Sequence, residues 1–133
     1  MSTKNREFKL KNIKEQQQVI SMLLQDLSTA EVPKEAVNDI RLALVEGINN
    51  AFIHGLRSIE GDVSVSWLLN NRSIRIEIAD KGNGFEYCPE KFSDRREESL
   101  LCEGGMGVFL IKQVMDEIFY NEKGNVLYGL ETW

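Results

Sequence analysis

The chain has 133 residues, of which 42% are hydrophobic and 28% are charged, a composition typical of a globular domain and unlike that of a disordered or fibrous chain. Its 16 basic and 21 acidic residues give a net charge of -5, which argues against the broad basic surface of a protein that binds nucleic acid or anionic lipid. Because no apolar run approaches the roughly 18 residues of a membrane span and residues 1–11 lack the apolar stretch of a secretory signal, we expect one cytoplasmic domain over residues 1–133, with no direct nucleic-acid or membrane contact.

The N-terminal half predicts a short strand followed by two helices. Residues 8–10 alternate apolar side chains with lysine, as in an edge strand. The next apolar residues recur at helical spacing behind Asn12, a favoured N-cap residue type, and predict a helix that ends near Ser28. Pro33 suits the first turn of a second helix, whose apolar positions continue to a C-terminal stop at Gly55.

The next part of the chain predicts a hairpin, a long irregular segment and a third helix. Residues 63–67 and 74–78 alternate apolar with polar side chains around Asn70-Asn71, which is typical of a β-hairpin. Residues 81–103 are highly charged and too long for a simple connection, so they predict either a functional lid or a disordered segment. Residues 106–118 then predict the third helix.

The chain closes with a second predicted hairpin, in which residues 118–120 pair with residues 126–130 and Gly124 is available for the turn. Parallel βαβ units would need a helix between every pair of strands. Helices grouped against consecutive hairpins therefore indicate an α+β fold.

Polar residues at a spacing of four mark the second predicted helix. Glu46, Asn50 and His54 fall on one side of that helix, whereas Leu44 and Ile48 face elsewhere. This stripe is consistent with a ligand site and also with an ordinary solvated helix face.

A turn rich in glycine follows the third predicted strand. Asp80 stands directly at the strand end, and Gly82 and Gly84 would let a ligand approach the backbone closely. The Asp80 carboxylate can accept a hydrogen bond from an exocyclic amine. An ordinary Asp/Gly turn is the alternative interpretation.

A second glycine-rich segment, Gly104-Gly105-Met106-Gly107, leads into the apolar helix that begins at Val108. A flexible backbone at a helix N-terminus presents unpaired N–H groups and the positive end of the helix dipole, which together suit a phosphate chain. A flexible hinge is the alternative.

The three groups of residues occur in a recognisable order. Residues 46–55, 80–85 and 104–117 resemble the three ATP-binding boxes of the GHKL superfamily. Within it, the sequence is most similar to the small anti-sigma-factor serine kinases of bacterial partner-switching systems, above all over residues 105–117. The resemblance covers the chain from Phe8 to the C-terminus.

The resemblance implies a two-layer α/β sandwich of the Bergerat type, with a mixed, mostly antiparallel sheet and helices on one face. It implies that ATP lies between the second and third helices beneath a lid over residues 86–103. It also implies that Asn50 binds Mg²⁺, that Glu46 acts as the general base and that Asp80 recognises the adenine amine. The nucleotide-binding residues are then Asn50, Asp80, Gly82, Gly84, Gly104, Gly105, Met106 and Gly107.

The implied function is that of an ATP-dependent serine protein kinase that also acts as an anti-sigma factor. Its partners would be a sigma factor, a small STAS-type anti-sigma antagonist that it phosphorylates, and a second copy in a homodimer. Relatives often carry an arginine shortly before the glycine loop, where this chain has Cys102 and Glu103. Arg95, Arg96 or Lys112 could take the place of that arginine as support for the γ-phosphate.

The alternative is a nucleotide-gated binding module with little or no kinase activity. A detached sensor histidine kinase domain is disfavoured, because nothing upstream of Glu46 supplies a helix that bears a phosphoacceptor histidine. A gyrase-like or chaperone-like ATPase is disfavoured as well, because it would need a further transducer domain.

Overall fold

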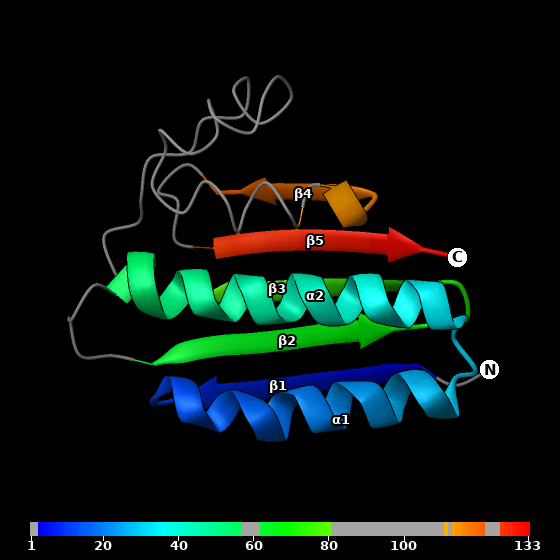
Figure 1. The fold of residues 1–133 in the computed structure, drawn as a ribbon, viewed down its shortest axis with the longest axis horizontal. Helices are drawn as coiled ribbons and strands as arrows, with labels where there is room; N and C mark the ends of the chain where they lie inside the picture. The colour runs from blue at the N-terminus through cyan, green and yellow to red at the C-terminus, as the bar shows by residue number, and fades with distance from the viewer. Residues whose placement is uncertain (1–2, 57–61, 81–110, 112, 122–125) are drawn as a thin grey trace.

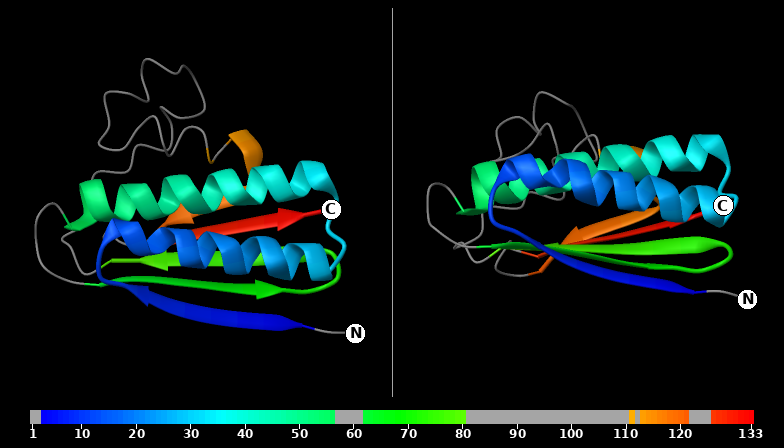
Figure 2. Two further views of the ribbon diagram at one scale, coloured as in Figure 1. Left: turned by 60° about the horizontal axis from the view of Figure 1, so that its bottom comes forward. Right: turned by 90° about the horizontal axis from the view of Figure 1, so that it is seen from below.

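The computed structural model describes residues 3–56, 62–80, 111, 113–121 and 126–133, with only the backbone described for residues 54–56. The described strands form one five-stranded sheet in the order β1-β2-β3-β5-β4, in which every pairing is antiparallel. The helices α1 and α2 lie side by side on one face of this sheet (Figures 1 and 2). The strands are β1 Lys4–Leu10, β2 Val63–Leu69, β3 Ser73–Ala79, β4 Glu117–Tyr120 and β5 Val126–Thr132, and the helices are α1 Gln16–Thr29 and α2 Lys34–Asn50.

The two-layer α+β architecture expected from the sequence is confirmed. β1 is an edge strand, as predicted, and both hairpins form at the expected places. The turn of the first hairpin is held by Asn70, whose Oδ1 accepts hydrogen bonds from the backbone N–H groups of Arg72 at 3.0 Å and Ser73 at 2.9 Å. No helix in the described part of the chain is long and apolar enough to cross a membrane.

The first helical segment begins at a capping box. Asn12 precedes a 3-10 turn at Ile13–Glu15, its Oδ1 accepts from Lys14 N at 3.0 Å, and Glu15 Oε1 accepts from Asn12 N at 3.1 Å. These bonds satisfy backbone donors that the start of a helix leaves free. α1 then continues to Thr29, close to the predicted end.

The second helical segment ends close to the predicted stop at Gly55, but its geometry changes before that point. α2 proper ends at Asn50, and the backbone continues as a π-helix over Ala51–Leu56, one residue beyond Gly55. The wider i→i+5 turns of a π-helix are uncommon and often occur at functional sites.

The end of the third predicted helix is also corrected, because β4 already begins at Glu117. The chain is tied to β5 just before that residue: Asp116 N donates to Glu131 Oε1 at 2.9 Å, and Thr132 N donates to Asp116 Oδ2 at 2.8 Å. Burial raises the pKa of Glu131, and the nearby charges of Asp116 and Asp39 add to that effect. These bonds turn the chain into β4 and leave no room for a further helical turn.

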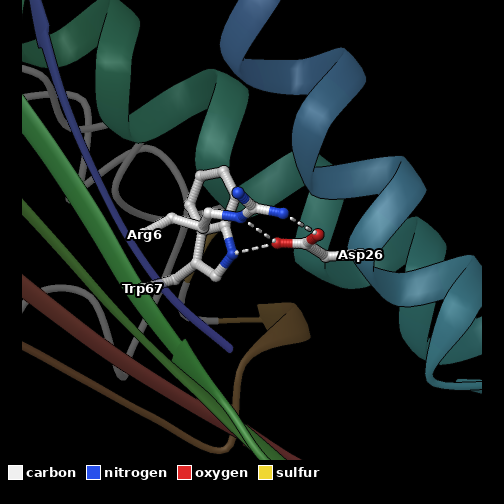
Figure 3. A network of polar contacts seen from close by, with 3 residues as sticks. All are labelled: Arg6, Asp26 and Trp67. Carbon is white, nitrogen blue, oxygen red and sulfur yellow. Dashed lines mark hydrogen bonds and ion pairs between the residues drawn. The ribbon is translucent and has the colours of Figure 1, made fainter. Parts of the chain in front are cut away.

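The core lies between the helical layer and the sheet. It is formed by the inward side chains of the strands and by one face of each helix, and it includes the fully buried Leu23, Leu44, Val65, Trp67 and Ile74. At one end of the sheet the core contains a polar network in which Asp26 of α1 accepts hydrogen bonds from Arg6 of β1 and from Trp67 of β2 (Figure 3). This network connects the edge strand, the first helix and the second strand.

Candidate nucleotide-binding site

The last turns of α2 carry two of the predicted site residues. Between them, Gly47 is buried and faces Ile78 of β3 and Leu127 of β5. A Cβ atom on Gly47 would overlap Ile78 Cδ1 and lie 3.0 Å from Leu127 Cδ2. Glycine thus lets the helix pack directly on the sheet, and this close packing fixes the height of Glu46 and Asn50 above the strands.

Asn50 is buried at the end of α2, with 6% of its surface exposed. The interpretation of Glu46, Asn50 and His54 as a solvated helix face is therefore wrong at Asn50. Asn50 Nδ2 has no hydrogen-bond partner among the residues that the structure describes. Among the described residues, Gln16 Oε1 is the other buried side-chain atom without a hydrogen-bond partner.

An unpaired buried amide is unfavourable, because a polar group removed from water without a partner costs about 1–3 kcal/mol. Asn50 follows Gly47 by less than one helical turn, and it is the last residue of α2 proper before the π-helix. Its amide therefore suits a ligand that brings its own polar atoms, such as phosphate oxygens or a hydrated cation.

Asp80 lies at the same end of the sheet. It follows β3 directly and is half-buried. The C-terminal ends of α2 and β3 lie at the same end of the molecule (Figure 1), and the packing of Gly47 against Ile78 holds the two elements together there. Asp80 thus lies at the same end of the molecule as the C-terminal end of the helix that carries Glu46 and Asn50. Glu46, like Asp80, is half-buried.

The described part of the chain contains no group of three or more His, Cys, Asp or Glu side chains that could hold a metal ion. A cation at Asn50 would therefore need most of its oxygen ligands from elsewhere. Mg²⁺ commonly takes one or two ligands from the protein and the rest from substrate phosphates and water. The donor set around Asn50 fits a metal that arrives with a nucleotide better than a metal bound by the protein alone.

The remaining predicted site residues lie outside the described residues: Gly82, Gly84, Gly104, Gly105, Met106 and Gly107, together with the lid, Arg95, Arg96 and Lys112. The segment that follows the glycine loop is described from Ile111. Ile111 and Met115 are buried in the core, with 1% and 6% of their surfaces exposed. They fix the end of this helical segment against the same core as α2.

The position of this candidate site, at the end of α2 and beside the end of β3, agrees with the protein family that the chain matches. Residues 10–128 match the histidine kinase-like ATPase domain. The chain belongs to this family. Membership implies that the chain binds ATP, and it accounts for a polar site at the end of a helix that packs on an antiparallel sheet.

Several curated relatives carry the name serine-protein kinase RsbW. The chain is 27% identical to the protein of that name from Listeria monocytogenes over 108 residues, which are 75% of this chain and 69% of the relative. It is 31% identical to the Staphylococcus epidermidis protein and 32% identical to the Staphylococcus aureus protein over 105 residues, which are 73% of this chain and 66% of each relative. The alignments thus span about two-thirds of the length of these relatives.

Sequence reasoning missed the importance of Gly47. The available signal was a glycine inside a strongly periodic helix, which lowers helix propensity and is usually retained only for a packing or functional reason. The pattern gave no indication of the strand that approaches it, because Ile78 and Leu127 are 31 and 80 positions away in the chain.

Proposed function

We propose that residues 1–133 form a single ATP-binding domain of a cytoplasmic serine protein kinase that also acts as an anti-sigma factor. The observation that carries this proposal is the buried Asn50 amide, unpaired at Nδ2 within the described residues, at the end of the sheet where Asp80 follows β3. Family membership and the similarity to proteins named serine-protein kinase support it. The anti-sigma activity rests on the sequence resemblance described above.

The role proposed for each residue follows from the chemistry of its side chain or backbone. Asn50 presents an amide oxygen to Mg²⁺, and its N–H₂ group can donate to a phosphate oxygen. Asp80 accepts a hydrogen bond from the adenine amine. The backbone of Gly104–Gly107, with Gly82 and Gly84 in the adenine-side turn, completes the nucleotide-binding residues in this proposal.

Glu46 would act as the general base. Its carboxylate takes the proton of the incoming serine hydroxyl while the serine oxygen forms a bond to the γ-phosphorus and the bond to the β-phosphate oxygen breaks, leaving ADP. Bound Mg²⁺ would neutralise charge on the phosphates. Glu46 is one residue before Gly47 and four before Asn50, so packing of the helix on the sheet would hold the base and the metal ligand at a fixed separation.

The proposed partners are a sigma factor, a small STAS-type anti-sigma antagonist and a second copy of the chain. One alternative function keeps the same nucleotide site. The chain would be a nucleotide-gated binding module that holds its partner but transfers phosphate poorly, and Cys102 and Glu103, where relatives often carry arginine, favour this alternative.

Two measurements on the same protein test the proposal. Calorimetry with Mg-ATP measures nucleotide binding, and ATP labelled at the γ-phosphate measures transfer to small STAS-domain proteins from the native host. We expect saturable ATP binding and label on a serine of one antagonist. Binding of ATP and partner without any transfer would favour the nucleotide-gated module, and absence of ATP binding would contradict both functions.

A further inference from the structure

Three acidic residues lie near the end of β5, at the end of the molecule where α2 begins (Figure 1). Glu131 is on β5, Asp116 directly precedes β4, and Asp39 is in the first half of α2. Glu131 is buried, with 6% of its surface exposed, although a carboxylate is seldom buried without a cation beside it. It forms no ion pair with any residue that the structure describes. Its burial therefore needs another explanation.

Hydrogen bonds connect Asp116 and the end of β5 in both directions. Asp116 N donates to Glu131 Oε1 at 2.9 Å, and Asp116 Oδ2 accepts from Thr132 N at 2.8 Å and from Thr132 Oγ1. A further hydrogen bond joins the carboxyl groups of Asp116 and Glu131. Two carboxyl groups can bond to each other only if one of them carries a proton. The bonded arrangement therefore holds one proton between Glu131 and Asp116.

The surroundings place this proton on Glu131. Burial raises the pKa of Glu131, and the charges of Asp116 and Asp39 add to that effect, although the N–H group of Asp116 opposes it. Hydrogen bonds from Thr132 lower the pKa of Asp116. On its other side, Glu131 pairs with Ile74 of β3, which brings no charge. Glu131 is thus the neutral donor of the pair, and Asp116 is the charged acceptor.

These bonds lie at the end of a helical segment that packs on the sheet. Ile111 and Met115 are buried in the core, and Met115 N donates to the carbonyl oxygen of Ile111 at 2.9 Å. Met115 Cε lies 3.2 Å from the position that a Cβ atom on Gly129 of β5 would take. The bonds of Asp116, the next residue, therefore fasten the end of this segment to β5. The same segment follows the glycine-rich residues 104–107 along the chain.

We propose that Glu131, Asp116 and Asp39 form a proton-dependent clasp, which holds the end of the helical segment to β5 while Glu131 keeps its proton and opens when that proton is lost. Loss of the proton removes the bond between the two carboxyl groups. It leaves two adjacent carboxylates near the charge of Asp39, and like charges in a buried place repel strongly. Opening lets water solvate Glu131. This inference goes beyond the proposed function and does not depend on it.

The pH dependence of the clasp has a definite direction. In the open clasp Glu131 is exposed to water and has the ordinary glutamate pKa of about 4.3, whereas in the closed clasp its pKa is higher. The closed form therefore binds more protons between these two values, and rising pH favours opening by up to about tenfold for each pH unit. Above the pKa of the closed form, the opening equilibrium no longer changes with pH.

Amide hydrogen exchange measures this opening once the rates are corrected for the intrinsic effect of pH on exchange. We expect the protection of the Asp116 and Thr132 amides to fall by up to about tenfold for each pH unit above about 4.3. Both should exchange faster than the amide of Leu23, which is fully buried in α1, because the clasp opens without unfolding of the core. A carbon NMR titration of the Glu131 carboxyl group on the same protein should give a midpoint above 4.3.

Three variants separate the parts of the clasp. In Glu131→Gln the amide oxygen still accepts from Asp116 N and the N–H₂ group donates to the Asp116 carboxylate, with no proton to lose, so protection at Asp116 and Thr132 should stay high at every pH above 4.3. Asp39→Asn removes a like charge, so the fall in protection should level off at a lower pH than in wild type. Glu77→Gln changes an exposed carboxylate on the neighbouring strand β3, and this control should keep the wild-type profile.

A Glu131 carboxyl group that titrates at or below about 4.3 would overturn the proposal, as would protection at Asp116 and Thr132 that does not fall with pH. The same fall in Glu131→Gln as in wild type would also overturn it. If the two amides exchange only at the rate of Leu23, the clasp does not open by itself and the proposal fails. Should circular dichroism find Glu131→Gln unfolded, the titration and the exchange profile of the wild-type chain decide alone.

Discussion

Arg6 of β1 and Asp26 of α1 form a two-pronged ion pair, in which Arg6 Nε donates to Asp26 Oδ2 and Nη2 donates to Oδ1, each at 3.0 Å (Figure 3). Trp67 Nε1 donates to Asp26 Oδ2 at 3.1 Å. Asp26 is only 2% exposed, whereas Arg6 is one-third exposed at its side chain. The carboxylate is therefore the buried member, and its donors come from two strands.

Removal of the Asp26 carboxylate should destabilise the fold. Asp26→Ala leaves Trp67 Nε1 buried without its acceptor and releases β1 from α1. We expect a loss of about 2–4 kcal/mol in the free energy of unfolding, measured with urea. Gln25→Ala, at the exposed neighbouring position of α1, should change it by less than about 0.5 kcal/mol.

The same carboxylate predicts the direction of a pH effect. Burial raises the pKa of Asp26, but hydrogen bonds from Arg6 and Trp67 and the charge of Arg6 outweigh it, so the pKa is lowered overall. Its contribution to stability is present above the unfolded-state pKa of about 3.9 and is lost as the pH falls through the lower folded-state value. Asp26→Asn should flatten the acid side of the curve of stability against pH. An acid limb as steep as in wild type would contradict this assignment.

Gly47→Ala tests how the helix packing supports the site. Alanine favours a helix over glycine by about 1 kcal/mol, but here its Cβ overlaps Ile78 Cδ1 in the core, and overpacking costs about 1–3 kcal/mol. We expect a net loss of stability of about 1 kcal/mol and weaker ATP binding, because α2 must move away from the sheet. A more stable variant with unchanged ATP affinity would mean that the core adapts to the extra methyl group.

Asn50→Ala tests the proposed metal ligand. The variant removes the unfavourable unpaired amide, but it also removes the packing of a buried side chain. Because the two effects oppose each other, the stability of the fold should change by less than about 1 kcal/mol. Mg²⁺-dependent ATP binding should fall below detection in calorimetry. Asn38→Ala, at an exposed position of the same helix, is the matched control and should bind ATP as wild type does. Unchanged ATP affinity in Asn50→Ala would refute the metal role.

Asp80→Asn tests recognition of the base. Asparagine keeps the size of the side chain but offers an N–H₂ donor as well as an oxygen, so the preference for the adenine amine should weaken. We expect the ratio of ATP to GTP affinity to fall by about tenfold, the equivalent of one hydrogen bond. Asp62→Asn, before β2, is the control. If Asp80→Asn keeps the wild-type preference for ATP over GTP, Asp80 does not recognise the adenine base.

Glu46→Gln tests the general base. Glutamine has the same shape but cannot accept the serine proton, and positioned acid-base catalysis typically supplies about 10²–10⁴-fold in rate. The variant should bind ATP and its sigma factor with unchanged affinity and lose phosphate transfer to the antagonist by that factor. A variant that matches an active wild type would show that another group takes the proton.

The sequence by itself determined the order of elements and the chemistry of the candidate site. Residues 63–67 and 74–78 alternate apolar with polar side chains, and they form β2 and β3 because alternation suits a sheet with one buried face. Asn12 with Glu15 starts the first helical segment, since a capping box depends only on neighbouring residues. The ATP-binding boxes could likewise be recognised as short local patterns.

Only the tertiary structure decided what depends on residues far apart in the chain. The structure shows that Asn50 is buried, and that Gly47, three residues earlier in the same helix, lies directly against Ile78 and Leu127. The start of β4 at Glu117 follows from the bonds that tie Asp116 to β5. Local periodicity carries no information on such contacts, because they depend on which strand lies beneath which helix, and the free energy of packing the whole core selects that arrangement.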